Sequence, residues 1–224
     1  MQSQYLKNLR LILKNNNISR KNRLKSKKQA PANYLIVCEG KKTEPNYFNG
    51  LKKEINKRYG KKVDVLIPDI EIKGMGKNTE DLIKYTQKYV NYSTKIYGQV
   101  WVVFDKDDYD DEQFDRAIRN CGYNSCWSNP NFELWLLSHF KKINKYISKD
   151  SIFTELDKEF QKYGLGNYTK NDSNIFEKIT ANDRIHDAIK NCEDMEKLNS
   201  DKLPSKRNPM TKVYNILKDF EDYL

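Results

Sequence analysis

The chain has 224 residues, 38% of them hydrophobic and 32% charged, with a formal net charge of +10. This length suits one domain, or one domain with a small appendage. The chain has no run of the roughly 18 apolar residues that a membrane span needs, and its first 30 residues lack the apolar core of a signal peptide. We therefore expect a cytoplasmic protein that does not contact a membrane.

The charge is concentrated at the amino terminus. Residues 1–30 hold nine Lys or Arg and no acid, so nine of the ten net positive charges lie there. A basic arm in front of a nearly neutral domain is typical of proteins that contact phosphate backbones. We expect Arg20, Lys21 and Arg23 to bind nucleic acid in this way; the alternative is a solvated tail.

The four cysteines form no C-x-x-C pair, and the chain has only two histidines. A structural zinc site is therefore not expected. The cysteines are predicted to be reduced and to act as small hydrophobic side chains.

The first predicted strand is the apolar run at residues 34–38, which has no alternation and so is typical of a strand buried on both faces. Thr43 and Pro45 then open a helix at about 44–59 that Gly60 ends. A second strand is predicted at 63–67, with 70–72 as its edge continuation beyond Pro68. After a loop, Asn78 or Thr79 caps the next helix.

Residues 99–104 form another buried run, followed by a helix at 112–120 and a strand at 123–127. Pro130 is predicted to occupy the first position of an interior helix that extends to residue 140. From residue 141 the pattern predicts helices without clear strands, at 151–163, 175–180, 182–198 and 209–224, the last with Asn208 and Pro209 as its cap and first residue.

This alternation of strands and helices predicts an α/β fold, with a small parallel sheet flanked by helices and a helical C-terminal extension. The expected organisation is a basic arm at 1–30, an α/β domain at 31–140, and a helical part at 141–224 that packs on it.

Acidic residues follow two of the buried strands. Glu39 comes directly after the first, and Asp105 and Asp107 come after the strand at 99–104. The carboxyl ends of parallel strands share one edge of a sheet, and alternate residues of an extended segment point the same way, so these groups are expected to converge. Converging carboxylates require a cation, and hard oxygen ligands favour Mg²⁺ or Mn²⁺, the ions of phosphodiester chemistry. The alternative is a solvated acidic loop with helix-capping aspartates.

An E-G pair after one strand and a D-x-D after another resemble the Toprim fold of topoisomerases, bacterial primases and OLD-type nucleases. Four ordered blocks together resemble the RloB-like family over about 33–216: V-C-E-G-K-K-T-E-P-N-Y-F, F-D-K-D-D, S-N-P-N-F-E-L-W-L-L-S-H-F and R-N-P-M-T-K-V-Y. The resemblance implies a Toprim-like α/β fold and a Mg²⁺-dependent nuclease that acts in abortive infection against phage. It also implies an ABC-type ATPase encoded alongside.

The same resemblance assigns roles to single residues. Glu39 matches the Toprim glutamate, Asp105 and Asp107 match the D-x-D pair, and Glu44 matches a second acid that could serve a second metal. Glu133 matches the acid of the family's N-P-x-F-E block, although a carboxylate at a helix start is also favoured by the helix dipole alone. The predicted catalytic residues are thus Glu39, Asp105, Asp107 and Glu133, and the predicted metal ligands are Glu39, Glu44, Asp105 and Asp107, with Asp108 as a replacement for Asp107 if the loop is shifted.

Three lysines beside these acids, Lys41, Lys42 and Lys106, could hold a substrate phosphate, or they could be ordinary surface lysines. Either Glu39 or a hydroxide on the metal could act as the base. The sequence leaves open whether the substrate is RNA, with transfer RNA suggested by analogy alone, or DNA, and it leaves the oligomeric state open. The alternative function is a non-catalytic nucleic-acid-binding or adaptor subunit of an ATPase-containing defence complex.

Overall fold

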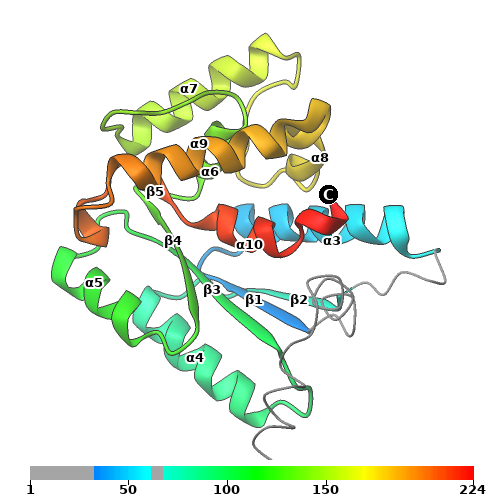
Figure 1. The fold of residues 1–224 in the computed structure, drawn as a ribbon, viewed down its shortest axis with the longest axis vertical. Coiled ribbons are helices and arrows are strands. Elements are labelled where there is room, and N and C mark those ends of the chain that lie inside the picture. Colours follow the sequence, from blue (N-terminus) through cyan, green and yellow to red (C-terminus); the bar gives the residue numbers. More distant parts are fainter. Residues whose placement is uncertain (1–32, 62–67) are drawn as a thin grey trace, which may run out of the picture. The chain divides into compact units, whose positions relative to one another are not determined.

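The computed structural model describes residues 33–61 and 68–224. Among these residues five strands form one sheet in the order β2-β1-β3-β4-β5 (Figure 1). The strands are β1 (Tyr34–Cys38), β2 (Ile70–Gly74), β3 (Gln99–Asp105), β4 (Asn124–Asn129) and β5 (Met210–Thr211). The first four are parallel, and β5 is antiparallel to β4.

The two apolar runs form the centre of the sheet, as predicted. Leu35, Ile36 and Val37 of β1 are fully buried, and Val102 and Phe104 of β3 are fully buried beside them. The register pairs Cys38 with Val103, and Asp105 with Ser128 of β4. Strands β1, β3 and β4 therefore end at nearly the same level, which places the residues that follow them along one edge of the sheet.

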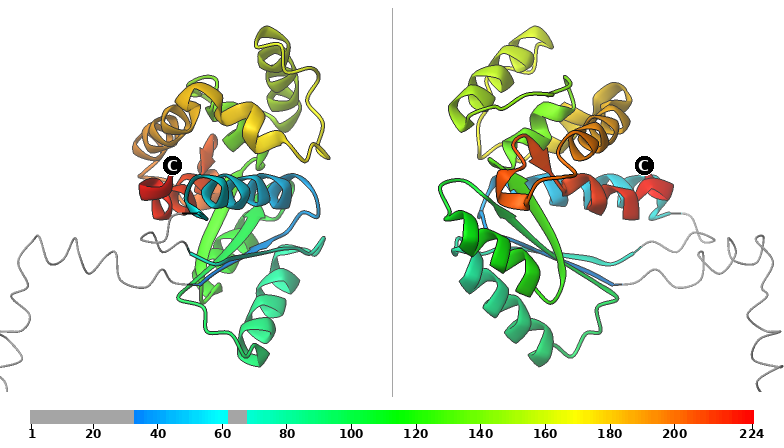
Figure 2. Two further views of the ribbon diagram at one scale, coloured as in Figure 1. Left: turned by 90° about the vertical axis from the view of Figure 1, so that its right-hand side faces the viewer. Right: turned by 60° about the vertical axis from the view of Figure 1, so that its left-hand side comes forward.

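Helices cover both faces of the sheet (Figures 1 and 2). Helix α3 (Thr43–Tyr59) lies on one face, whereas α4 (Thr79–Tyr92) and α5 (Asp111–Asn120) lie on the other. Two of these helices start at polar caps, because the side chain of Asn78 accepts a hydrogen bond from the Asp81 amide and that of Asp110 accepts one from the Gln113 amide. The predicted α/β fold with helices on both faces is confirmed.

The C-terminal helices gather on the α3 side of the sheet (Figure 2). They are α6 (Glu133–Ser138), α7 (Lys149–Lys162), α8 (Ile175–Thr180), α9 (Arg184–Leu198) and α10 (Val213–Asp219), with short 3₁₀ turns at Ala181–Asp183, Pro204–Lys206 and Glu221–Tyr223. Helix α6 is the interior helix that its sequence predicts, because Leu134, Trp135, Leu136 and Leu137 are all fully buried.

Pro130 is not the first residue of a helix, contrary to the sequence prediction. Helix α6 begins at Glu133, and the Asn129–Pro130 peptide bond is cis. The carbonyl of Pro130 accepts a hydrogen bond from the Asp107 amide at 2.8 Å. Residues 130–132 therefore connect β4 to α6 and support the loop that follows β3.

The predicted helix at 209–224 is also wrong at its start. Pro209 follows a cis peptide bond and precedes β5, whose Thr211 Oγ1 lies 2.9 Å from Ser128 Oγ on β4. Helix α10 starts only at Val213, because Met210 and Thr211 complete the sheet beside β4. The C-terminal part thus contributes a strand as well as helices, and Asn208 is not a helix cap.

Two sequence predictions lie outside the described residues: the strand at 63–67 and the basic arm at 1–30 with Arg20, Lys21 and Arg23. The edge position expected for 70–72 is confirmed by β2. All four cysteines are free and buried. Within 33–61 and 68–224, no helix combines the length and apolarity needed to cross a membrane.

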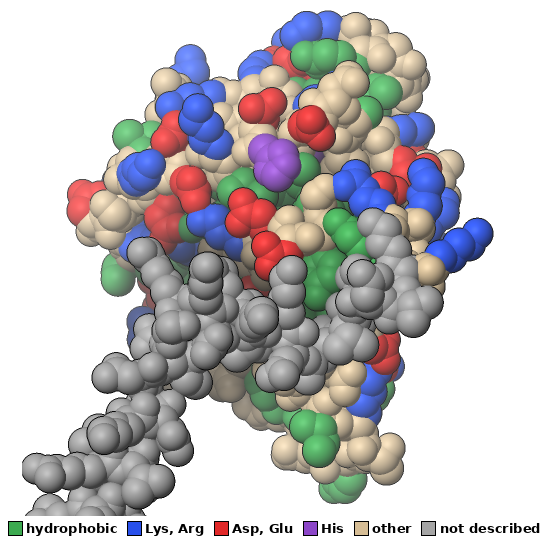
Figure 3. Space-filling model, turned by 45° about the vertical axis from the view of Figure 1, so that its right-hand side comes forward, with side chains coloured by type: hydrophobic (Ala, Val, Ile, Leu, Met, Phe, Trp, Pro, Cys, Tyr) green, Lys and Arg blue, Asp and Glu red, His purple; other side chains and the backbone are tan. Residues whose placement is uncertain are grey.

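The charges of the described part are mixed. On the face seen in Figure 3, Lys and Arg side chains are interspersed with Asp and Glu side chains, and among the coloured atoms no broad area carries one sign. Recognition of an anion on this face would therefore depend on particular lysines and their surroundings rather than on a general positive field.

Candidate active site

A pocket of about 560 Å³ opens at the carboxyl edge of the sheet. It is lined by the segment after β1, the start of α4, the loop after β3, the start of α6 and part of the loop between α7 and α8. All five acids that the sequence selects line it: Glu39, Glu44, Asp105, Asp107 and Glu133. The fold therefore brings together residues that are up to 94 positions apart in the chain.

Glu39 is fastened where β1 ends. Its amide donates to the Val103 carbonyl at 2.9 Å, and its Oε2 accepts a hydrogen bond from the Thr79 hydroxyl at 3.2 Å. Burial raises the pKa of Glu39 to about 7; hydrogen bonds from Thr79 and the Asp105 amide oppose this rise, and repulsion by Glu44 and Asp107 adds to it. Helix α4 thus positions this carboxylate, and at neutral pH much of it can carry a proton.

Asp105 ends β3 with a carboxylate that is only half satisfied. The Phe132 amide donates a hydrogen bond to the carboxylate, yet Oδ1 is inaccessible to solvent and has no hydrogen-bond partner among the described residues. The residue as a whole is partly exposed, although this oxygen is not. Burial raises the pKa of Asp105 well above its ordinary value, and repulsion by Glu44, Glu133 and Asp107 adds to this.

Gly40 explains the spacing of Glu39 and Glu44. The Gly40 amide donates to Glu44 Oε1 at 3.1 Å, and a Cβ on residue 40 would lie 2.3 Å from Glu44 Oε2. Any larger residue would displace the Glu44 carboxylate, which is only 7% exposed. Burial raises the pKa of Glu44, as does repulsion by Glu133, while hydrogen bonds from its own amide and from Gly40 oppose the rise.

Asp107 reaches the pocket by a turn and not, as expected, along an extended segment. Strand β3 ends at Asp105, and Asp107 has a left-handed backbone with φ of 36°. The argument from alternating side chains is therefore wrong, although Asp107 still lines the pocket, as does Asp108. Lys149 at the start of α7 forms an ion pair with Asp107, with Nζ 2.7 Å from Oδ2.

Glu133 is held by a loop that sequence reasoning missed. Its Oε1 accepts a hydrogen bond from the Tyr168 hydroxyl at 3.0 Å and lies 3.6 Å from Lys170 Nζ. The loop is anchored to the start of α3, because Thr43 Oγ1 donates to the Lys170 carbonyl at 3.1 Å. Neither Tyr168 nor Lys170 lies in a recognisable motif, so only the three-dimensional fold connects them with the acids.

The three predicted phosphate-binding lysines all line the pocket, but they differ in freedom. Lys41 and Lys42 are exposed, and the stem of Lys41 lies against Gly76, where a Cβ would come within 2.3 Å of Lys41 Cε. Lys106 is buried; its Nζ lies 3.1 Å from Asp111 Oδ1 and donates to the Tyr109 carbonyl. Of the three, Lys41 and Lys42 are the ones whose ammonium groups are open to a ligand.

His139 does not take part in the pocket. It is buried, its Nδ1 lies 3.0 Å from the Trp135 carbonyl, and burial lowers its pKa to about 3. It is therefore a neutral core histidine.

The five carboxylates are the hard oxygen donors that Mg²⁺ and Mn²⁺ prefer, and the unpartnered Asp105 Oδ1 suits a cation. In the described part of the chain, however, no three acidic, histidine or cysteine side chains are already arranged as a ligand set. Four of the carboxylates have other partners instead: Thr79 for Glu39, Gly40 for Glu44, Lys149 for Asp107, and Tyr168 and Lys170 for Glu133. The donor chemistry fits such an ion, and a common geometry would require some of these contacts to change.

Comparison with known proteins gives one result. The sequence model of the family described as RloB-like protein matches residues 34–220. The chain belongs to the RloB-like family. The match covers β1 through α10 and includes every described acid of the pocket. No curated protein and no solved structure matches the chain significantly.

Proposed function

We propose that this RloB-like protein is a metal-dependent nuclease that hydrolyses phosphodiester bonds in RNA or DNA. The observation that carries the proposal is the Asp105 carboxylate, which has a buried oxygen without a partner among the described residues and lines one pocket with four other acids. Desolvated carboxylates that repel one another destabilise a fold unless a cation joins them, which makes such a cluster a candidate functional site.

Asp105, Asp107, Glu39 and Glu44 would hold the ion, which we take to be Mg²⁺ or Mn²⁺. When bound, such an ion stabilises negative charge on a phosphate and lowers the pKa of water. Glu39, oriented by Thr79 and the Asp105 amide, accepts the proton of the attacking water. Glu133, oriented by Tyr168 and Lys170, borders the same space and completes the catalytic group.

Lys41 and Lys42 bind the phosphates beside the cleaved bond, because their ammonium groups are exposed at the rim of the pocket. The basic arm, with Arg20, Lys21 and Arg23, adds contacts to the phosphate backbone that do not depend on sequence. Deleting residues 1–28 should weaken binding of nucleic acid and flatten its dependence on salt; an unchanged salt slope would mean that the arm does not bind the backbone.

The biological role that we propose is abortive infection against phage, in the cytoplasm and together with an ABC-type ATPase encoded alongside. Membership in the RloB-like family supports this role. The proposal is tested by incubating the purified protein with Mg²⁺ or Mn²⁺ and, separately, total RNA, plasmid DNA and single-stranded DNA. Metal-dependent cleavage of any of them, absent with EDTA and in Asp105→Asn, is the expected result.

The alternative is a non-catalytic adaptor that docks on nucleic acid or on the ATPase. Lys149 and Lys170 favour it, because two ammonium groups already neutralise part of the acidic cluster without a metal. An adaptor should bind divalent ions weakly and leave all three substrates intact, with or without the partner ATPase.

A further inference from the structure

A second pocket adjoins the active-site pocket. It has a volume of about 930 Å³ and is lined mainly by residues 144–150 and 198–209; we call it the distal pocket. The two pockets share Lys106, Asp107 and Asp108 as lining residues. A chain-like ligand with one group over the acids would therefore continue directly into the distal pocket.

The distal pocket presents one aromatic ring to solvent. Tyr146 is 74% exposed, although exposed large hydrophobic residues are uncommon on the described surface. The backbone beside it is held in place, because the Asn208 side chain accepts a hydrogen bond from the Ile147 amide and donates one to the Ile147 carbonyl, each at 3.1 Å. Asn199 in turn donates to the carbonyl of Pro209, the next residue, at 3.0 Å. The backbone at Ile147 is thus held by hydrogen bonds, while the side chain of Tyr146 next to it stays exposed.

Five lysines line the same pocket as this ring, and two of them have no carboxylate partner among the described residues. Lys149 pairs with Asp107 and Lys206 with Asp111. Lys145 is exposed without an ion pair, and Lys202 donates only to the Asn199 side-chain oxygen at 2.9 Å. A preorganised aromatic face beside uncompensated ammonium groups matches the way in which proteins hold single-stranded nucleic acid, by stacking a base and binding its phosphates.

We propose that the distal pocket binds an unpaired nucleotide of the substrate, next to the bond that is cleaved. Its base stacks on Tyr146, and Lys145 and Lys202 bind the flanking phosphates. The proposal rests on the proposed function, since the strand must lead to the acidic pocket. A base inside a duplex has both faces covered by its neighbours, so the ring selects an unpaired stretch of RNA or DNA.

The first experiment measures binding of the full chain, in EDTA to prevent cleavage, to labelled single strands of about 16 nucleotides in RNA and DNA forms and to a blunt duplex. Tyr146→Ala should weaken binding of a single strand roughly 5- to 150-fold, the range for loss of one stacked base. Tyr146→Phe, which keeps the ring, should bind like the wild type. Tyr92→Ala is the matched control and should have no effect, because Tyr92 is also exposed but lines neither of the two pockets. Comparison of the RNA and DNA strands identifies the nucleic acid.

Two results would overturn the inference: Tyr146→Ala binding a single strand as tightly as the wild type, or a wild type that binds the duplex more tightly than either single strand. A second measurement concerns charge. Lys145→Ala and Lys202→Ala should each lower the slope of log affinity against log salt by about 0.7, the value for one phosphate contact on a single strand, and an unchanged slope in both would remove the phosphate contacts from the proposal.

The cleavage assay of the proposed function separates the two ideas. Binding that depends on Tyr146 without metal-dependent cleavage supports the distal pocket and contradicts the nuclease. Cleavage in Asp105-intact protein that Tyr146→Ala leaves unchanged, in rate and in affinity, supports the nuclease and overturns the distal pocket. A strand carrying 5-iodouracil provides a direct check, since irradiation should crosslink it to the peptide that contains Tyr146.

Discussion

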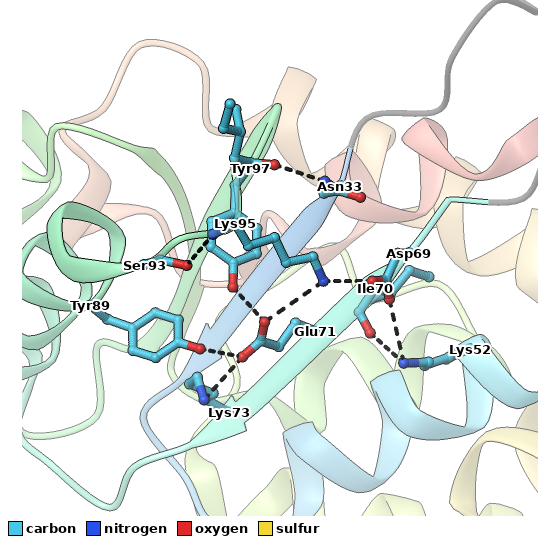
Figure 4. A network of polar contacts seen from close by, with 11 residues as sticks. Asn33, Lys52, Asp69, Ile70, Glu71, Lys73, Tyr89, Ser93, Lys95 and Tyr97 are labelled. Atoms are coloured by element: carbon cyan, nitrogen blue, oxygen red, sulfur yellow. Dashed lines mark hydrogen bonds and ion pairs between the residues drawn. The ribbon is translucent and has the colours of Figure 1, made fainter.

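The carboxylates of this molecule lie in two opposite kinds of environment, shown by Glu71 on β2 and by the acidic pocket at the carboxyl edge of the sheet. Glu71 on β2 lies in a network in which every oxygen has donors (Figure 4): the Tyr89 hydroxyl at 2.5 Å, the Tyr97 hydroxyl and the Lys73 ammonium at 3.1 Å. Burial pushes its pKa up, but these hydrogen bonds outweigh burial and lower the pKa to about 2. In the pocket, burial and repulsion instead raise the pKa values of Glu39, Glu44 and Asp105.

The contrast shows that this fold can supply hydrogen-bond donors to a carboxylate, so their shortage at Asp105 is a local property of the pocket. The same fold supplies tyrosines and lysines to Glu71, where the carboxylate joins β2 to the segment after α4. Along the carboxyl edge a buried oxygen of Asp105 has no donor within the part of the chain that the structure describes. A site that costs stability in this way is expected where function requires it.

The largest expected effect comes from Asp105→Asn. Cleavage should fall by more than ~100-fold, because even residues that only support a metal ligand cost up to that factor. The loss is measured as the initial rate of cleavage in Mn²⁺, with the nucleic acid that the cleavage assay identifies as substrate. Full activity in this variant would break the assignment of the pocket.

The same variant sharpens the comparison through stability. In EDTA, Asp105→Asn should unfold at the same temperature as the wild type or higher, because the change removes a desolvated charge whose raised pKa destabilises the fold above pH 4. Adding Mn²⁺ should stabilise the wild type, by about 2.7 kcal/mol at one hundred times the dissociation constant, and Asp105→Asn less. A large drop in the melting temperature of the metal-free variant would mean that Asp105 is structural.

Glu71→Gln should show the reverse pattern. Loss of hydrogen bonds to a charged group at a side chain that is 26% exposed should lower the free energy of unfolding by about 1–2 kcal/mol, or the melting temperature by about 2–8 °C. Cleavage per folded molecule should be unchanged. Thermal unfolding and initial rates on the same preparation test both halves, and loss of activity without loss of stability would contradict the structural role.

The pH dependence of that stability difference follows from the lowered pKa of Glu71. A depressed carboxyl pKa contributes stability above the ordinary value near 4.5, and this contribution is lost as the pH falls from there toward 2. The difference in unfolding free energy between the wild type and Glu71→Gln should therefore be constant above about pH 5 and shrink below it. Urea unfolding at several pH values measures the difference; one that grows on acidification would refute the network.

The smallest effect is expected for Lys149→Met. Its ion pair with Asp107 is 40% and 37% exposed, and such pairs contribute about 0–1 kcal/mol. Removing the ammonium should raise the affinity of the pocket for Mn²⁺ by up to about 5-fold, because the ion no longer competes with a lysine. Titration calorimetry measures this, with Lys158→Met on the same helix as the control, since Lys158 pairs with Glu155 away from the pocket.

Local patterns predicted the parts of the fold that local physics decides. Unbroken apolar runs predicted β1 and β3, and of the two caps predicted for α4, Asn78 and Thr79, Asn78 is the one observed. Glu39 and Asp105 could be paired because strand ends of a parallel sheet coincide. Each of these inferences needs only neighbours in the chain or one rule about sheets.

The features that the sequence did not predict depend on contacts between residues far apart in the chain. Met210 and Thr211 carry no strand signal of their own and become β5 only because β4 offers an unpaired edge. Tyr168, Lys170 and Lys149 reach the acids from beyond residue 141, through contacts such as Thr43 with the Lys170 carbonyl. Asp107 enters by a left-handed turn that the amide-to-Pro130 hydrogen bond supports, which its sequence does not reveal.

Because Tyr168, Lys170 and Lys149 all lie beyond residue 141, truncating the protein has a predictable consequence. A fragment that stops at residue 140 contains all five acids, yet it lacks the hydroxyl and the two ammonium groups that contact Glu133 and Asp107, and it exposes the outer edge of β4. Such a fragment should aggregate through that edge. It should be stable to unfolding only at low pH, where the five carboxyl groups are protonated and do not repel one another. The part of this chain that carries the five acids is therefore not a transferable module, and grafting its motif onto another sheet would require the distant loop as well.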